Sequence, residues 1–136
     1  MSHVSNLRAE SVLMVEDDPT LLDMLAQTLQ RAGFTVVTAV HGADALARMR
    51  ELVPDVVVTD ILMPEMDGFE LIRTLRAQWP ELPIVAMYGI QDTPNFRNQA
   101  LKFGAQAALS KPVNRAHLVE VMRDVMQPAS ISGRGA

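Results

Sequence analysis

Five short apolar runs alternate with amphipathic stretches along the 136-residue chain, and this alternation constrains the fold more than any other feature. Each apolar run has the length of a buried strand, and each is bounded by polar, glycine or proline residues. Strands that alternate with helices are typical of consecutive βα units and a parallel sheet. The predicted strands are Ser11 to Val15, Phe34 to Ala39, Asp55 to Thr59, Pro83 to Tyr88 and Ala107 to Leu109.

The stretches between and after these runs predict five helices, because their apolar residues recur every three or four positions. The first is marked by Leu22, Leu25 and Leu29 and the third by Phe69, Ile72 and Leu75, and the others are expected over Ala43 to Leu52, Pro94 to Phe103 and Arg115 to Met126.

Residues at the predicted helix boundaries agree with this reading. Asp18 followed by Pro19 has the pattern of an N-cap with proline at the first helical position, and Gly33 and Gly104 stand where helices should end. Crossovers between parallel strands are right-handed, so the units close most simply as a doubly wound sheet. We therefore expect a flavodoxin-like α/β fold with five parallel strands in the order 2-1-3-4-5 and helices on both faces.

Composition limits the class of protein. The absence of cysteine excludes disulfides, thiol catalysis and Cys-based zinc sites, and favours a cytoplasmic location. The 12 basic residues form no cluster, so no direct binding to nucleic acid is expected, and no apolar run is long enough for a membrane span. One domain is expected over residues 11–126, with an N-terminal extension (1–10) and a flexible tail or linker start (127–136).

Polar residues follow several of the predicted strands. Glu16 and Asp17 follow the first strand, Asp60 the third and Lys111 the fifth, while Tyr88 ends the fourth. Ligands of doubly wound sheets bind beyond the carboxyl ends of the strands. The five residues are therefore expected along one edge of the sheet.

Asp60 lies within the stretch VVVTDILMPEMDG, where an acidic side chain among apolar residues loses hydration and needs a partner, a cation or a chemical purpose. Carboxylates gathered within about 4 Å repel by roughly 4 kcal/mol per pair at an effective dielectric near 20. A divalent cation removes that cost, and a carboxylate-rich site suits Mg²⁺. His3, His41 and His117 show no metal-ligand spacing and are expected in surface or loop roles.

A metal beside one carboxylate and one lysine is suited to phosphoryl transfer, with the carboxylate as nucleophile and an acyl phosphate as product. The ordered motifs VLMVEDDP, DILMPEMDG, PIVAMYG and ALKFGAQAALSKP resemble those of response-regulator receiver domains, the phosphoacceptor modules of two-component signalling. The resemblance covers about Ser11 to Met126. It implies a signalling module that accepts a phosphoryl group from a histidine kinase or phosphotransfer protein.

The resemblance also implies a role for each site residue. Asp60 would be phosphorylated, Lys111 would pair with the phosphoryl group, and the bond from Lys111 to Pro112 would be cis. Protein ligands to Mg²⁺ would be Asp17 and Asp60 directly, Glu16 through water, and the backbone carbonyl of Leu62. Asp18 is better explained as the helix cap. A downstream protein or output domain would bind the face formed by the fourth helix, fifth strand and fifth helix.

Two positions depart from the family pattern. Tyr88 replaces the usual Thr or Ser at the end of the fourth strand, and Ala108 replaces the usual aromatic residue three positions before the lysine. The phenol of Tyr88 could supply the missing hydroxyl, or its ring could fill the space beside Ala108. The expectation is that phosphorylation is retained while its coupling to partners is altered.

Other readings stay open at this point. Taken singly, Glu16 and Asp17 could cap the first helix, Lys111 could be a solvated surface residue, and Tyr88 could be an ordinary strand-end aromatic. The chain could be an interaction module that no longer depends on phosphate. It could also be a Mg²⁺-dependent phosphohydrolase, although Leu62 stands where such an enzyme would carry a second carboxylate.

Overall fold

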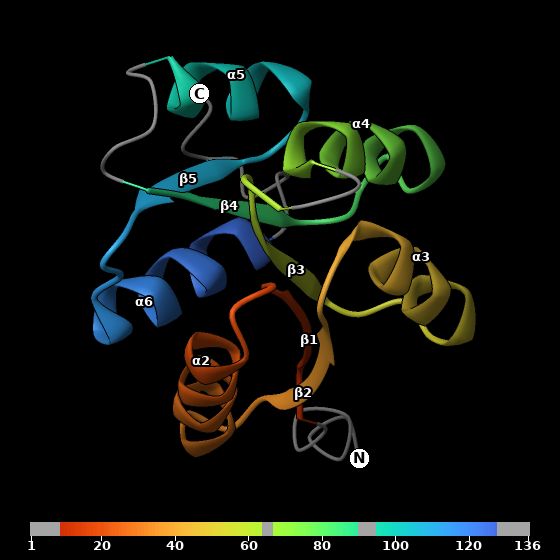
Figure 1. The fold of residues 1–136 in the computed structure, drawn as a ribbon. Coiled ribbons are helices and arrows are strands. Elements are labelled where there is room, and N and C mark those ends of the chain that lie inside the picture. Colours follow the sequence, from red (N-terminus) through yellow and green to blue (C-terminus); the bar gives the residue numbers. More distant parts are fainter. Residues whose placement is uncertain (1–8, 64–66, 90–94, 128–136) are drawn as a thin grey trace.

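The computed structural model describes residues 9–63, 67–89 and 95–127. Within these ranges five parallel strands form one sheet in the order β2-β1-β3-β4-β5, which confirms the predicted doubly wound topology (Figure 1). The strands are β1 (Ser11–Val15), β2 (Thr35–Ala39), β3 (Val56–Asp60), β4 (Ile84–Tyr88) and β5 (Ala107–Ser110). They agree with the predicted runs to within one residue at each end.

Helices cover both faces of the sheet, with α2 and α6 on one face and α3, α4 and α5 on the other (Figure 1). Their bounds are α2 (Pro19–Arg31), α3 (Gly42–Glu51), α4 (Gly68–Gln78), α5 (Phe96–Phe103) and α6 (Arg115–Met126). The predicted start of the fourth helix at Pro94 lies outside the described residues, and α5 begins at Phe96. No helix in the described ranges is long and apolar enough to cross a bilayer.

The strands supply two apolar layers because successive side chains point to opposite faces of the sheet. Val57 and Ile84 belong to the cluster beneath α3, α4 and α5, whereas Val58 and Val85 belong to the cluster beneath α2 and α6. All five residues of β3 are buried, as expected for the central strand of a sheet covered on both faces. A rigid, fully buried strand therefore carries Asp60 to the carboxyl edge.

The predicted helix caps are present. The side chain of Asp18 accepts hydrogen bonds from the backbone N–H groups of Thr20 (3.0 Å) and Leu21 (3.3 Å), with Pro19 at the start of α2. Gly104 caps the end of α5 with a φ of 131°, a conformation that favours glycine. The predicted N-terminal extension and tail fall mainly outside the described residues, and those boundaries stay predictions.

Candidate functional site

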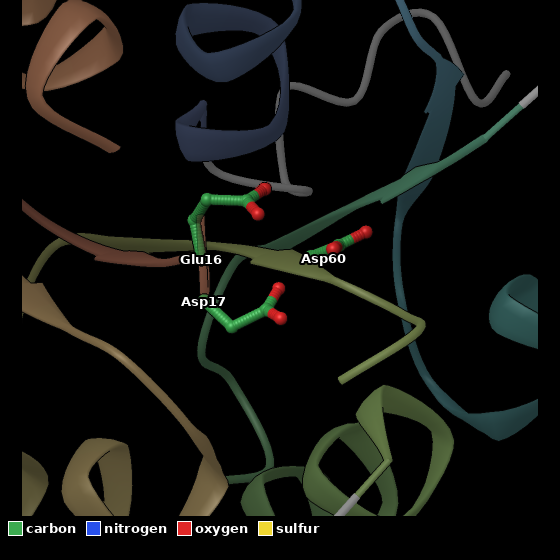
Figure 2. A group of neighbouring side chains, drawn as sticks. All are labelled: Glu16, Asp17 and Asp60. Atoms are coloured by element: carbon green, nitrogen blue, oxygen red, sulfur yellow. The ribbon is translucent and has the colours of Figure 1, made fainter. Parts of the chain in front are cut away.

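Three carboxylates gather at the carboxyl edge of the sheet. Glu16 and Asp17 directly follow β1, and Asp60 is the last residue of β3, so neighbouring strands bring them together. Each offers one oxygen, and these atoms lie within 4.8 Å of one another (Figure 2). Glu16 and Asp60 are only 1% and 4% exposed, whereas Asp17 is exposed. The cluster therefore has two buried members and one that faces solvent.

Lys111 brings a cation to this cluster from the other end of the chain. Its Nζ lies 3.0 Å from Oε1 of Glu16 and 3.1 Å from Oδ2 of Asp60. Its backbone N–H donates to the carbonyl of Tyr88 (2.8 Å), which continues the pairing of β5 with β4, and its peptide bond to Pro112 is cis, as expected. The ammonium is therefore placed between two carboxylates by the end of the sheet.

Hydrogen bonds at the end of β3 fix the orientation of Asp60. Its Oδ1 accepts a hydrogen bond from the N–H of Ile61 (2.9 Å), and its backbone carbonyl accepts one from the hydroxyl of Thr59 (2.9 Å). The N–H of Ile61 also donates to the carbonyl of Met87 on β4 (2.9 Å). These contacts leave Oδ2 of Asp60 facing Lys111.

Gly68 packs directly against the backbone next to Asp60. Its N–H donates to the carbonyl of Ile61 (2.6 Å), where α4 begins. A Cβ atom at this position would lie 2.4 Å from the carbonyl oxygen of Asp60 and 2.5 Å from the Cα of Ile61. Only glycine fits without a shift of the backbone that carries Asp60.

Burial and the charges of neighbouring groups shift the pKa values of the ionisable residues in the cluster. Burial raises the pKa of Asp60, and the charge of Asp17 adds to this, against the opposing effect of Lys111. Burial also raises the pKa of Glu16, assisted by the charge of Asp60. For Lys111, burial alone would lower the pKa, but the hydrogen bond to Glu16 and the charges of both carboxylates outweigh it and raise the pKa. The ammonium of Lys111 therefore compensates only part of the negative charge of the three carboxylates.

Four of the five residues predicted along this edge come together, namely Glu16, Asp17, Asp60 and Lys111. The fifth, Tyr88, ends β4 at the same edge, but its half-buried side chain packs with the core cluster that contains Ala108. It also lines a hollow of about 320 Å³ together with Arg97, Ala108 and His117. Tyr88 therefore borders the hollow beside β5, on the side of the expected output face.

Leu62 and the three histidines are the remaining residues considered from the sequence. Leu62 is 52% exposed, and the ligand role of its carbonyl stays a prediction. His41 caps α3 by accepting from the N–H of Asp44 (3.1 Å), and His117 is exposed in α6, in agreement with the expected surface or loop roles. His3 lies outside the described residues.

Two features of the site were missed from the sequence. The close approach of Gly68 had only one signal in the sequence, a glycine immediately before the third predicted helix. The direct ion pair between Glu16 and Lys111 was not predicted either, because the roles expected for Glu16 were a water-mediated metal ligand and a cap of the first helix. Nothing in the sequence spacing indicates which carboxylate a distant lysine will contact.

Comparison with known proteins identifies the family. The family described as "Response regulator receiver domain" matches residues 12–123. The transcriptional regulatory protein PrrA of Mycobacterium tuberculosis is 36% identical over 116 residues, which cover 85% of this chain and 49% of that protein. The C4-dicarboxylate transport transcriptional regulatory protein DctD of Rhizobium meliloti is 37% identical over 115 residues, which cover 85% of this chain and 25% of that protein.

Solved structures agree with these matches. The chemotaxis protein CheY4 of Vibrio cholerae has a TM-score of 0.80 at 32% identity, covering 87% of this chain and 99% of that one. A response regulator receiver domain protein from Clostridium thermocellum has a TM-score of 0.81 at 28% identity, covering 86% and 94%. The chain spans about half or less of the length of the curated relatives described above. It belongs to the response regulator receiver domain family of two-component signalling proteins.

Proposed function

We propose that this chain accepts a phosphoryl group on Asp60 from a histidine kinase or a phosphotransfer protein, and that phosphorylation changes its binding to partners. The observation that supports this proposal most strongly is the position of Lys111, whose Nζ lies 3.1 Å from Oδ2 of Asp60 beside an acidic cluster. An ammonium and a buried carboxylate in contact at a strand end suit phosphoryl transfer better than a structural role alone.

The donor set of the cluster fits a magnesium ion. Three carboxylates offer oxygens within 4.8 Å of one another, and the exposed Asp17 leaves a solvent-facing side where an ion could keep several waters. We assign Asp17 and Asp60 as direct ligands, the carbonyl of Leu62 as a third, and Glu16 to the outer sphere. When bound, the ion would supply positive charge that neutralises these carboxylates and the oxygens of an incoming phosphoryl group.

Asp60, Ile61 and Lys111 each have a role in the transfer itself. An oxygen of Asp60 attacks phosphorus, the bond from phosphorus to the donor breaks, and the electron pair of that bond leaves with the donor group. Ile61 holds Oδ1 of Asp60 through its N–H (2.9 Å), which orients the carboxylate for attack. Lys111 then pairs with an oxygen of the transferred group. The product is an aspartyl phosphate.

The output of this reaction is assigned to the face formed by α5, β5 and α6. Tyr88 borders this face through the hollow that it shares with Arg97 and His117, and its backbone carbonyl contacts the N–H of Lys111 (2.8 Å). The packing of Tyr88 against the cluster containing Ala108 supports the option in which its ring fills space beside Ala108. Downstream proteins or an attached output domain are the proposed partners of this face, in the cytoplasm, and the domain itself is assigned no nucleic-acid surface.

Incubation with Mg²⁺ and acetyl phosphate tests the phosphoacceptor assignment. The native chain should gain one phosphoryl group, as measured by intact-protein mass spectrometry, and Asp60→Asn should gain none. Asp23→Asn is the matched control, because it removes an exposed carboxylate from α2 and should leave the gain unchanged. Equal incorporation by the native chain and Asp60→Asn would contradict the assignment.

A phosphate-independent interaction module is the second candidate function. It is favoured by the position of Tyr88, which packs with the cluster around Ala108 instead of approaching Asp60. Amide NMR signals from β5 and α6 would separate the two candidates. Signals that shift on phosphorylation support a switch, and signals that stay fixed support the module.

A further inference from the structure

We infer that Glu16 is a positioning residue for the transfer to Asp60, and that it acts by holding Lys111 against Asp60 more than by binding the metal. This inference rests on the proposed phosphoacceptor function, which it deepens. The two carboxylate oxygens of Glu16 both have donors from the protein. Oε1 lies 3.0 Å from Nζ of Lys111, and Oε2 accepts a hydrogen bond from the N–H of Asp18 (3.1 Å).

The base of the Glu16 side chain is held firmly. Its backbone N–H donates to the carbonyl of Ala39 (3.1 Å), which extends the pairing of β1 with β2 by one residue. Its side chain is only 1% exposed, and the bond to the N–H of Asp18 fixes it from the start of α2. Glu16 therefore presents Oε1 to Lys111 from a rigid support.

Lys111 needs such a support. Its four-carbon stem has many rotamers, and its side chain is 25% exposed, so the ammonium has a route to solvent. Contact with Asp60 alone is a poor anchor, because Asp60 is the residue whose charge changes on phosphorylation. Glu16 is not modified by the transfer and so holds the ammonium where the phosphoryl oxygens will arrive.

This arrangement separates Glu16 from Asp17. Asp17 is exposed, whereas Glu16 is buried and contacts both Lys111 and the N–H of Asp18. Loss of Glu16 should therefore slow the chemical step through Lys111, while loss of Asp17 should weaken metal affinity. The two acidic residues after β1 thus have different tasks.

Two variants separate the effect of the length of the Glu16 side chain from the effect of its negative charge. Glu16→Gln keeps the length of the side chain and removes the charge that attracts Lys111. Glu16→Asp keeps the charge but withdraws the carboxylate by about 1.5 Å, the length of one carbon–carbon bond. If Glu16 acts by contact with Lys111, both variants should behave alike. If only negative charge near the metal matters, Glu16→Asp should behave like the native chain.

The first measurement needs neither metal nor phosphate. The sequence contains only two lysines, Lys102 and Lys111, so amine acylation in EDTA followed by peptide mass spectrometry reports each separately. Lys102 is exposed on α5 and serves as the internal reference. Both Glu16 variants should raise the acylation rate of Lys111 relative to Lys102 by at least about threefold, because the ammonium is released to solvent. An unchanged ratio would overturn the inference, whether or not Asp60 proves to be the phosphoacceptor.

The second measurement is a double-mutant cycle on phosphorylation by acetyl phosphate, at an Mg²⁺ concentration that saturates the native chain. Glu16→Gln should lower the rate by at least about fivefold in the native background and by less than about twofold in a Lys111→Met background. Equal losses in the two backgrounds, or full recovery of Glu16→Gln when Mg²⁺ is raised further, would show that Glu16 does not act through Lys111. Circular dichroism and thermal unfolding of each variant verify the fold.

Discussion

Nζ of Lys111 lies 3.1 Å from Oδ2 of Asp60, although the two residues belong to opposite halves of the chain. The contact forms because β3 ends with Asp60, β5 ends one residue before Lys111, and β4 lies between these two strands. Parallel strands end at the same edge, so the topology alone brings the two residues near each other. The side chains then complete the ion pair above the end of β4.

Replacement of Lys111 tests its separate effects on chemistry and on metal binding. Lys111→Met should lower the rate of phosphorylation by about 100-fold, because a preorganised positive charge at the phosphoryl oxygens is lost. The same change should tighten Mg²⁺ binding, because it removes a competing cation from the acidic cluster. Isothermal titration calorimetry measures the second effect. Lys102→Met is the control and should alter neither, and weaker Mg²⁺ binding by Lys111→Met would contradict the prediction.

A methyl group at Gly68 should disturb the backbone that carries Asp60. Gly68→Ala places Cβ 2.4 Å from the carbonyl of Asp60, so we expect a loss of about 1–3 kcal/mol in the free energy of unfolding and slower phosphorylation. Urea denaturation and acetyl phosphate labelling measure the two effects.

Gly33→Ala is the matched control for Gly68→Ala. Gly33 has a φ of 103° and open space around its Cβ direction, so this change should cost about 1–2 kcal/mol through backbone strain alone. It should leave the rate of phosphorylation of the folded protein unchanged. If Gly68→Ala behaved in the same way, its close approach would have no importance for the site.

Neutralising Asp60 should stabilise the metal-free fold at neutral pH. Burial raises the pKa of Asp60, so the folded chain holds its proton more tightly than the unfolded chain does. Stability therefore falls as pH rises from the ordinary carboxyl pKa through the raised one, and above that interval the full cost of the buried charge is present. Urea denaturation in EDTA should give a higher midpoint for Asp60→Asn than for the native chain at pH 7.5.

The difference between Asp60→Asn and the native chain should shrink as pH falls through the raised pKa of Asp60, and it should level off below the ordinary carboxyl pKa, where the carboxyl is protonated in both the folded and the unfolded state. Asp23→Asn again serves as the exposed control and should show no comparable pH dependence. A native chain that is more stable than Asp60→Asn at pH 7.5 without metal would mean that the ion pair with Lys111 outweighs burial.

The phenol hydroxyl of Tyr88 should be dispensable, whereas its ring should not. Tyr88→Phe keeps the packing against the cluster around Ala108, so phosphorylation and the accompanying NMR shifts in β5 and α6 should stay within about twofold of native. Tyr88→Ala empties part of the space beside Ala108 and should abolish those shifts while phosphorylation persists. Loss of phosphorylation in Tyr88→Phe would instead assign the hydroxyl to the phosphoryl group.

The fold was predictable because each of its determinants is local or periodic. Alternating apolar runs place five strands, the right-handed crossover rule orders them, and the pair Asp18–Pro19 starts α2. The common edge of Glu16, Asp17, Asp60 and Lys111 follows from that topology. These inferences need only the direction of the strands and the residues that follow them.

Side-chain contacts within the site were less predictable. Whether Lys111 pairs with Glu16, Asp60 or both depends on side-chain length and rotamer, which sequence spacing does not encode. The contact of Gly68 with Asp60 depends on how the chain returns into α4. Tyr88 ends its strand where the ring could turn toward the site or toward the hollow, and only packing around Ala108 decides between them.

Chemical mapping of the phosphorylated residue tests most directly whether Asp60 is the phosphoacceptor. After incubation with Mg²⁺ and acetyl phosphate, borohydride reduces an aspartyl phosphate to homoserine, and peptide mass spectrometry locates the reduced residue. We predict conversion of Asp60 and of no other carboxylate. Conversion of Asp17 in place of Asp60, or no conversion at all, would contradict this prediction.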